Sequence, residues 1–152
     1  MKKVVYIDMD GVIANFDSGV AKLNAMQRGV YRNDLDLVPN IFASFDPMEG
    51  AVNAVKRLCE KYDVYILTTA PWRNPSAWSD KLIWIQRWFG DGENSPLYKR
   101  IVITHNKSLL KGDCLIEDNP RKNGADKFEG KVLHFGGKDF PNWETVLEEL
   151  NA

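Results

Sequence analysis

Two aspartates spaced two residues apart, Asp8 and Asp10, come directly after an apolar run near the start of the chain. If the backbone stays extended, alternation puts both carboxylates on the same side. The four apolar residues before them predict a buried strand, and ligands bind beyond the carboxyl ends of strands in an open α/β sheet. Neighbouring acids repel, so a hard cation such as Mg2+ or a shared proton must compensate their charge. The segment alone is equally typical of a turn.

Three further polar clusters follow later apolar runs. They are Thr68 and Thr69 after residues 64–67, Lys107 after residues 101–104, and Glu117 and Asp118 after residues 114–116. The carboxyl ends of parallel strands lie on one edge of a sheet, so we expect all four clusters to converge there. A chance turn explains any one cluster, but it does not easily explain four such clusters, each at the end of a strand.

The converging side chains favour phosphoryl chemistry. Asp8, Asp10 and an acid at 117–118 offer oxygen ligands without His or Cys, which favours Mg2+ over zinc. A threonine hydroxyl and a lysine suit phosphate oxygens. One aspartate can attack phosphorus to give an aspartyl-phosphate, and a second acid can protonate the leaving alcohol and later activate water. The metal and the lysine would neutralise the charge on the phosphoryl group.

Apolar runs alternate with helical patterns along the chain, which predicts an α/β fold with a mostly parallel five-stranded sheet. The expected strands are residues 3–8, 64–67, 101–104, 114–116 and 131–135. The expected helices are one capped by Asp46 and running to residue 62, one capped by Ser79 and ended by Gly90, and one at 143–150 capped by Asn142. Residues 15–45 interrupt this rhythm with a helical stretch at 20–26, so we expect a small insert that covers the site.

Composition narrows the classes of function. The 152 residues, 44% hydrophobic and 27% charged, fit one globular domain over 1–152. A formal net charge of −1 argues against polymeric nucleic acid or a membrane as partner, whereas a small phosphorylated ligand remains allowed. Two cysteines are too few for a disulfide framework or a zinc site. The first apolar run is too short for a signal peptide, so a cytoplasmic location is expected by default.

The combined motifs resemble a known family. Residues 8–16, 66–71, 84–90, 101–107 and 115–120 are similar to the haloacid dehalogenase superfamily, above all to the 5'(3')-deoxyribonucleotidase branch of its phosphatases. The four-part motif set is specific, although no single part is. The resemblance implies a Rossmann-like three-layer αβα fold with the first strand central and a small helical cap, matching residues 15–45, after it.

The resemblance also implies a role for each matching residue. Asp8 would be the nucleophile, and Asp10 the general acid and base whose backbone carbonyl binds Mg2+. The implied phosphate-binding residues are Thr68, Thr69, Lys107 and Lys81. Asp118, with Asp8 and Asp10, would hold Mg2+, and Glu117 would help from behind the metal ligands. The substrate would be a small phosphorylated molecule, a nucleoside monophosphate above all.

The chain departs from the branch at two points. Glu117 stands where the branch usually has aspartate, and the insert lacks the aromatic-rich pattern that grips a nucleobase in larger members. Phe16 and Phe42 could grip a base, although packing in the core is the more common role of such residues. A phosphatase for another metabolite, such as a sugar phosphate, and a non-catalytic module that binds Mg2+ and a phosphate ligand therefore stay open as alternatives.

Overall fold

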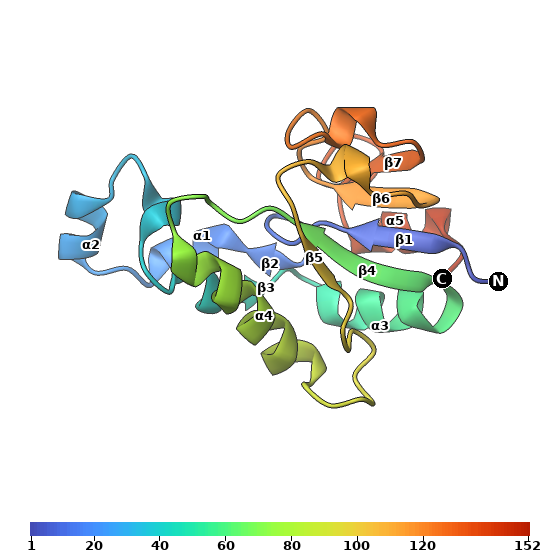
Figure 1. The fold of residues 1–152 in the computed structure, drawn as a ribbon, viewed down its shortest axis with the longest axis horizontal. Coiled ribbons are helices and arrows are strands. Elements are labelled where there is room, and N and C mark those ends of the chain that lie inside the picture. The colour runs from blue at the N-terminus through green and yellow to red at the C-terminus, as the bar shows by residue number, and fades with distance from the viewer.

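A five-stranded parallel sheet forms the centre of the molecule in the computed structural model, which describes all residues 1–152. The strands are β1 (Val4–Ile7), β4 (Asp63–Thr68), β5 (Ile101–Ile103), β6 (Cys114–Glu117) and β7 (Lys131–His134), in the order β5-β4-β1-β6-β7 (Figure 1). All four pairings are parallel, and β1 pairs with both β4 and β6. The predicted α/β class, a mostly parallel five-stranded sheet with the first strand central, is confirmed.

One face of the sheet packs against α-helices. Alternation places Val5, Ile7, Ile66 and Ile116 on this face, where they join the larger core cluster. The covering helices are α3 (Ala51–Lys61), α4 (Pro75–Phe89) and α5 (Trp143–Glu149), each with buried residues in the same cluster. The amphipathic pattern of α3, with Ala51, Val55 and Leu58 buried, explains its docking.

The opposite face has a much thinner cover. Tyr6, Leu67 and Leu115 point to it and pack against Ala125 and Phe128 in a separate, smaller cluster. The two connections that cross this face carry only single 3-10 turns, η3 (Lys107–Leu109) and η4 (Ala125–Lys127). The third layer is therefore made of short turns and loops instead of α-helices.

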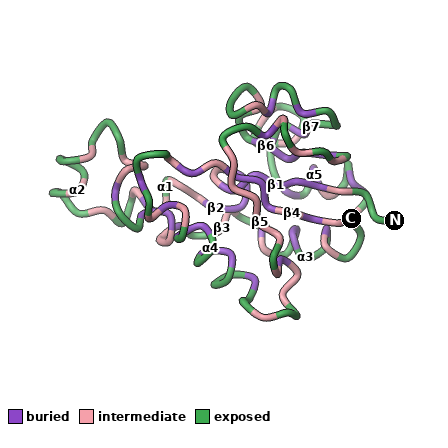
Figure 2. Tube along the Cα trace, viewed as in Figure 1, coloured by how far each residue is buried: buried purple, intermediate pink, exposed green.

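The segment between β1 and α3 extends from one end of the sheet (Figure 1). It contains α1 (Phe16–Ala21), α2 (Ala25–Val30) and the 3-10 turns η1 (Leu35–Leu37) and η2 (Ile41–Ala43), framed by a two-stranded ribbon of β2 (Ala14–Asn15) and β3 (Asp46–Pro47). Its inner part docks on α4, because Phe45 is buried and its carbonyl accepts a hydrogen bond from Trp84 Nε1 at 2.8 Å. The outer helix α2 has no buried residue (Figure 2).

Three predicted helix starts are wrong. Asp46 and Pro47 pair with β2, and α3 begins only after Gly50, whose φ of +75° ends the preceding turn. Helix α4 begins at Pro75 and not after Ser79. Proline suits the first helical position, because it has no backbone N–H that would lack a hydrogen-bond partner there. The stretch at 20–26 is divided between α1 and α2.

The break in that stretch has a local cause. Asn24 caps α2, because its side chain accepts from the Gln27 backbone and its own backbone N–H donates to the Gln27 side chain. The predicted cap of α5 at Asn142 and the end of α4 at Gly90 are confirmed. Every helix of the structure is too short or too polar to cross a membrane.

Candidate active site

The four polar clusters converge at the carboxyl edge of the sheet. Asp8 and Asp10 follow β1, Thr68 ends β4, and Glu117 and Asp118 lie at the end of β6. Two buried lysines, Lys107 on η3 and Lys81 on α4, reach the same edge from opposite faces of the sheet. Each lysine pairs with one member of the Asp-x-Asp segment, which divides the site into two halves.

In the first half, Lys107 joins two acids. Its Nζ donates to Asp8 Oδ1 at 2.9 Å and to Glu117 Oε2 at 2.5 Å, and the lysine is only 1% exposed. Burial alone would lower the pKa of Lys107, but the charges of Asp8 and Glu117 outweigh it and raise the pKa above its usual value. Glu117 Oε1 accepts from the Asn119 backbone N–H at 3.2 Å, so both oxygens of this acid are engaged.

The loop after β6 holds Lys107 in place. The Lys107 backbone N–H donates to the Asn123 carbonyl at 2.6 Å, and Asn106 caps η3 through the Ser108 backbone N–H. Gly124, with a φ of +76°, lets the loop approach, because a Cβ there would lie 2.2 Å from Asn106 Oδ1. A 3-10 turn of three residues can therefore present a lysine at a fixed position.

In the second half, Lys81 joins one acid and one hydroxyl. Its Nζ donates to Asp10 Oδ2 at 2.7 Å and to Thr68 Oγ1 at 2.9 Å, and it lies 4.7 Å from the centre of the Phe42 ring. Asp10 Oδ1 is buried without a hydrogen-bond partner. Burial raises the pKa of Asp10 although Lys81 acts in the opposite direction. Because Thr68 accepts from Lys81, its own hydroxyl hydrogen is free to donate.

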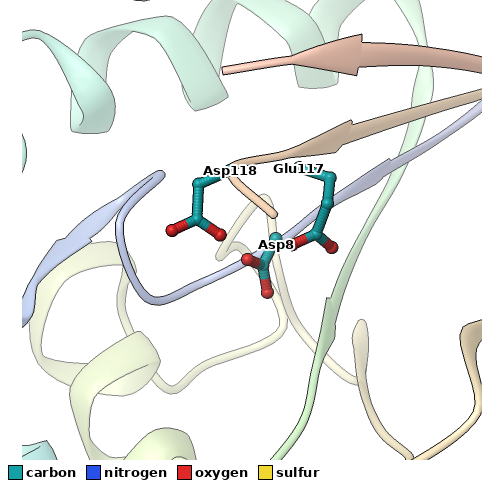
Figure 3. A group of neighbouring side chains, drawn as sticks. All are labelled: Asp8, Glu117 and Asp118. Atoms are coloured by element: carbon teal, nitrogen blue, oxygen red, sulfur yellow. The ribbon is translucent and has the colours of Figure 1, made fainter. Parts of the chain in front are cut away.

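Three acids face a common point beside Lys107. One carboxylate oxygen from each of Asp8, Glu117 and Asp118 lies within 4.8 Å of the others (Figure 3). Burial and the neighbouring charge of Asp8 raise the pKa of Glu117 to about 8. Burial and contact with Asp8 raise the pKa of Asp118 to about 7. Such crowding of carboxylates fits a divalent cation with oxygen ligands.

Asp118 reaches this point because residue 11 is a glycine. Gly11 has a φ of +79°, and a Cβ on it would lie 2.3 Å from Asp118 Oδ2. Glu117 is already engaged at both oxygens, so Asp8 and Asp118 are the acids with oxygens available to a metal.

Three pockets open at this edge: one of about 390 Å3 lies beside Gly11 and Met48, and the other two adjoin each other. The first of the adjoining two has a volume of about 210 Å3 and is lined by the acids of both halves, Lys107 and the loop residues Lys122 and Asn123. The second, of about 400 Å3, is lined by Phe16 and Phe42 of the insert and by the exposed Trp72 on the loop after β4. The Thr69 hydroxyl lies between them but donates to the Thr104 carbonyl at 2.7 Å, which leaves it only acceptor capacity. Larger hollows of about 510 and 560 Å3 lie at the opposite end of the sheet, away from these acids.

The structure brings together Asp8, Asp10, Thr68, Lys81, Lys107, Glu117 and Asp118, and it places Thr69 at the pocket wall. The sequence analysis missed the hydrogen bonds that Asn119 makes to Glu117 and Asn123 makes to Lys107. Their position directly after the strand-end acids was the available signal, because a loop there must cross the same edge.

Comparison with known proteins identifies the family. The model of the family described as 5' nucleotidase, deoxy (pyrimidine), cytosolic type C protein matches residues 26–139. A Vibrio phage KVP40 protein named "Putative 5'(3')-deoxyribonucleotidase" is 43% identical over 99% of this chain and 86% of its own. The chain belongs to this nucleotidase family. The 5'(3')-deoxyribonucleotidase of Bacillus subtilis is 28% identical over 99% of this chain and 95% of its own.

A solved structure supports the fold of this family member. The HAD-hydrolase YfnB from Bacillus subtilis, in a magnesium-bound form, superposes with a TM-score of 0.68 at 12% identity and covers 99% of both chains. Membership in this family makes the chain a hydrolase of phosphoric monoesters, and its fold is that of a HAD hydrolase.

Proposed function

We propose that the protein is a Mg2+-dependent deoxyribonucleotidase that removes phosphate from nucleoside monophosphates through an aspartyl-phosphate. The different environments of the two aspartates carry this proposal. Asp8 pairs with Lys107 and has a free oxygen, whereas burial favours the protonated form of Asp10. An aspartate with a free oxygen suits a nucleophile, and a neighbouring aspartate with a raised pKa suits a general acid.

Each residue then has a defined task. Asp8 Oδ2 attacks phosphorus, and the bond to the ester oxygen breaks as Asp10 gives its proton to that oxygen. Asp10 next takes a proton from water, which attacks phosphorus and releases Asp8 and phosphate. Thr68 donates its hydroxyl hydrogen to a phosphoryl oxygen, and Lys81 and Lys107 stabilise the negative charge.

Bound Mg2+ would neutralise charge on the phosphoryl group and orient it. Asp8 and Asp118, with the Asp10 backbone carbonyl, would hold it. Glu117 keeps Lys107 in position from behind these ligands. The all-oxygen donors and the raised pKa of Asp118 support a hard divalent cation at this point.

The aromatic pocket supports a nucleotide as substrate. It shares Asp10 and Thr69 with the acidic pocket, so a molecule with its phosphate among the acids extends into it. Phe42 is buried against Phe45 but also faces this pocket, and Phe16 and Trp72 complete an apolar wall suited to a flat base. Residues 15–45 would thus act as a cap over the base.

A panel of phosphate esters assayed with Mg2+ tests the proposal. We expect turnover of deoxynucleoside monophosphates, and loss of turnover in Asp8→Asn with the circular dichroism spectrum unchanged. Asp126→Asn, an exposed acid away from the pockets, is the matched control. No turnover of any monoester by metal-loaded protein would refute the enzyme, and hydrolysis of sugar phosphates alone would refute the nucleotide substrate.

A further inference from the structure

Lys122 lies at the junction of the two pockets. It lines both the acidic pocket and the aromatic pocket, together with Asn123 next to it. Its side chain is exposed and makes no hydrogen bond or ion pair. Lysines on a protein surface are commonly solvated, so its position alone decides little.

The other lysines of the site are already engaged. Lys107 binds Asp8 and Glu117, and Lys81 binds Asp10 and Thr68. Both are buried, so neither can move outward to meet an incoming ligand. Among the three lysines that border this site, Lys122 is therefore the one that is free to bind an incoming group.

The charge of the acidic pocket makes such a cation useful. Four carboxylates, those of Asp8, Asp10, Glu117 and Asp118, line it against only Lys107 and Lys122. A phosphate monoester carries about two negative charges at neutral pH. Lys81, paired with Asp10, and bound Mg2+ would offset part of this negative charge, and a mobile lysine at the entrance lowers the remaining repulsion on an approaching substrate.

Backbone hydrogen bonds fix the position of the Lys122 Cα. The Lys122 N–H donates to the Asn119 carbonyl at 3.2 Å, and the Lys122 carbonyl accepts from Ala125 N at 3.0 Å. Asn123, with a φ of +54°, turns its carbonyl to the Lys107 N–H. The Lys122 Cα is therefore held beside the catalytic lysine while its side chain stays free.

We propose that Lys122 is the substrate-capturing residue of this site, binding an outer oxygen of the phosphate group from the open side. The proposal rests on the proposed phosphatase function. Because this lysine is exposed and flexible, we expect it to contact that oxygen equally well in the bound substrate and in the transition state, which lowers KM and leaves kcat unchanged.

Steady-state kinetics of Lys122→Met against Lys127→Met test this role. Lys127 is an exposed lysine on η4 that lines neither pocket, so its removal changes the net charge equally. For hydrolysis of p-nitrophenyl phosphate and of deoxynucleoside monophosphates, we expect KM to rise about tenfold in Lys122→Met only. The kcat should stay within about twofold, and Lys122→Arg should restore most of the affinity.

Binding of inorganic phosphate to the Mg2+-loaded protein provides a second measurement that needs no turnover. Calorimetry should give a Kd about tenfold higher for Lys122→Met than for Lys127→Met. Equal KM and Kd values in the two variants, or a lower kcat at unchanged KM, would overturn the capturing role. Wild-type protein that binds phosphate but hydrolyses no monoester would instead overturn the proposed function, while the phosphate titration still decides the role of Lys122.

Discussion

The two halves of the site each pair a buried lysine with an aspartate of the Asp-x-Asp segment, but the two lysines differ in their surroundings. Lys107 sits on a three-residue turn and contacts two acids, whereas Lys81 sits within the 15-residue helix α4 and contacts one acid and a hydroxyl. Lys81 also touches the insert through Phe42, but Lys107 touches only the core. The difference separates a half in which one cation joins two acids from a half that links Asp10 to the insert.

Replacing each lysine in turn should give the largest difference between the halves, measured as the free energy of unfolding. Lys107→Met leaves Asp8 and Glu117 buried without a cation, so we expect unfolding to become easier by about 3–5 kcal/mol. Lys81→Met leaves only Asp10, whose side chain is 30% exposed, and we expect a loss of about 1–3 kcal/mol. Urea denaturation of the metal-free variants gives both values.

Two controls refine that comparison. Lys127→Met should change stability by less than about 0.5 kcal/mol. Adding Glu117→Gln to Lys107→Met removes one uncompensated acid and should recover part of the loss. Equal losses for the two buried lysines would contradict the asymmetry of the halves.

Gly11→Ala should damage the metal side of the Lys107 half. Its Cβ would meet Asp118 Oδ2 at 2.3 Å, whereas the Cβ of Gly50→Ala would meet nothing closer than Trp143 Cβ at 3.9 Å. Both glycines have φ between +75° and +79°, so each variant should lose about 1 kcal/mol from backbone strain. Only Gly11→Ala should also weaken Mg2+ binding, measured by calorimetric titration. An unchanged Mg2+ affinity would show that Asp118 is not a ligand.

Mg2+ binding should depend on pH through the same half. The raised pKa of Asp118, about 7, means that a proton competes with the metal below that pH. The Mg2+ affinity should therefore rise about tenfold from pH 6 to pH 8. Calorimetric titrations at both pH values measure this rise, and a flat profile would contradict it.

The stability of the metal-free protein should change in the opposite sense. Folding raises the pKa of Glu117 to about 8, so the folded protein keeps a proton that the unfolded chain has released. Stability without metal should fall as the pH rises from about 4.5 towards 8. Thermal unfolding across this range, with and without Mg2+, follows the effect.

The smallest expected effect concerns Phe42. A double-mutant cycle of Phe42→Leu and Lys81→Met should give a coupling of about 1 kcal/mol, because the ammonium lies over the ring. The same cycle with Lys107→Met should give a coupling near zero, since that lysine does not contact the ring. Coupling of similar size in both cycles would remove the distinction between the halves.

The two halves also differ in how far the sequence predicted them. Asp8, Glu117 and Asp118 stand directly at strand ends, where the alternation of strands and helices indicates a shared edge. Lys107 lies within a few residues of such an end. Local order along the chain is therefore enough to predict most of this half.

The Lys81 half depends more on tertiary packing. The resemblance to known phosphatases marked Lys81, but its contact with Asp10 follows from the docking of α4, whose start at Pro75 was mispredicted. Phe42 faces both a core cluster and a pocket, which no periodicity can distinguish. The hydroxyl of Thr69 is committed to the Thr104 carbonyl, a pairing that depends on the neighbouring strand β5.

The thin face of the sheet has a consequence for how this enzyme can change during evolution. The loops that cover Tyr6 and Leu115 are the same loops that place Lys107 and Asn123, so an insertion there would disturb core and chemistry together. Helix α2 has no buried residue, so an insertion there would not disturb the core. New sequence can lengthen the chain at α2 with little loss of stability. The length of the chain can thus vary at α2 while the loops on the thin face stay constrained in length.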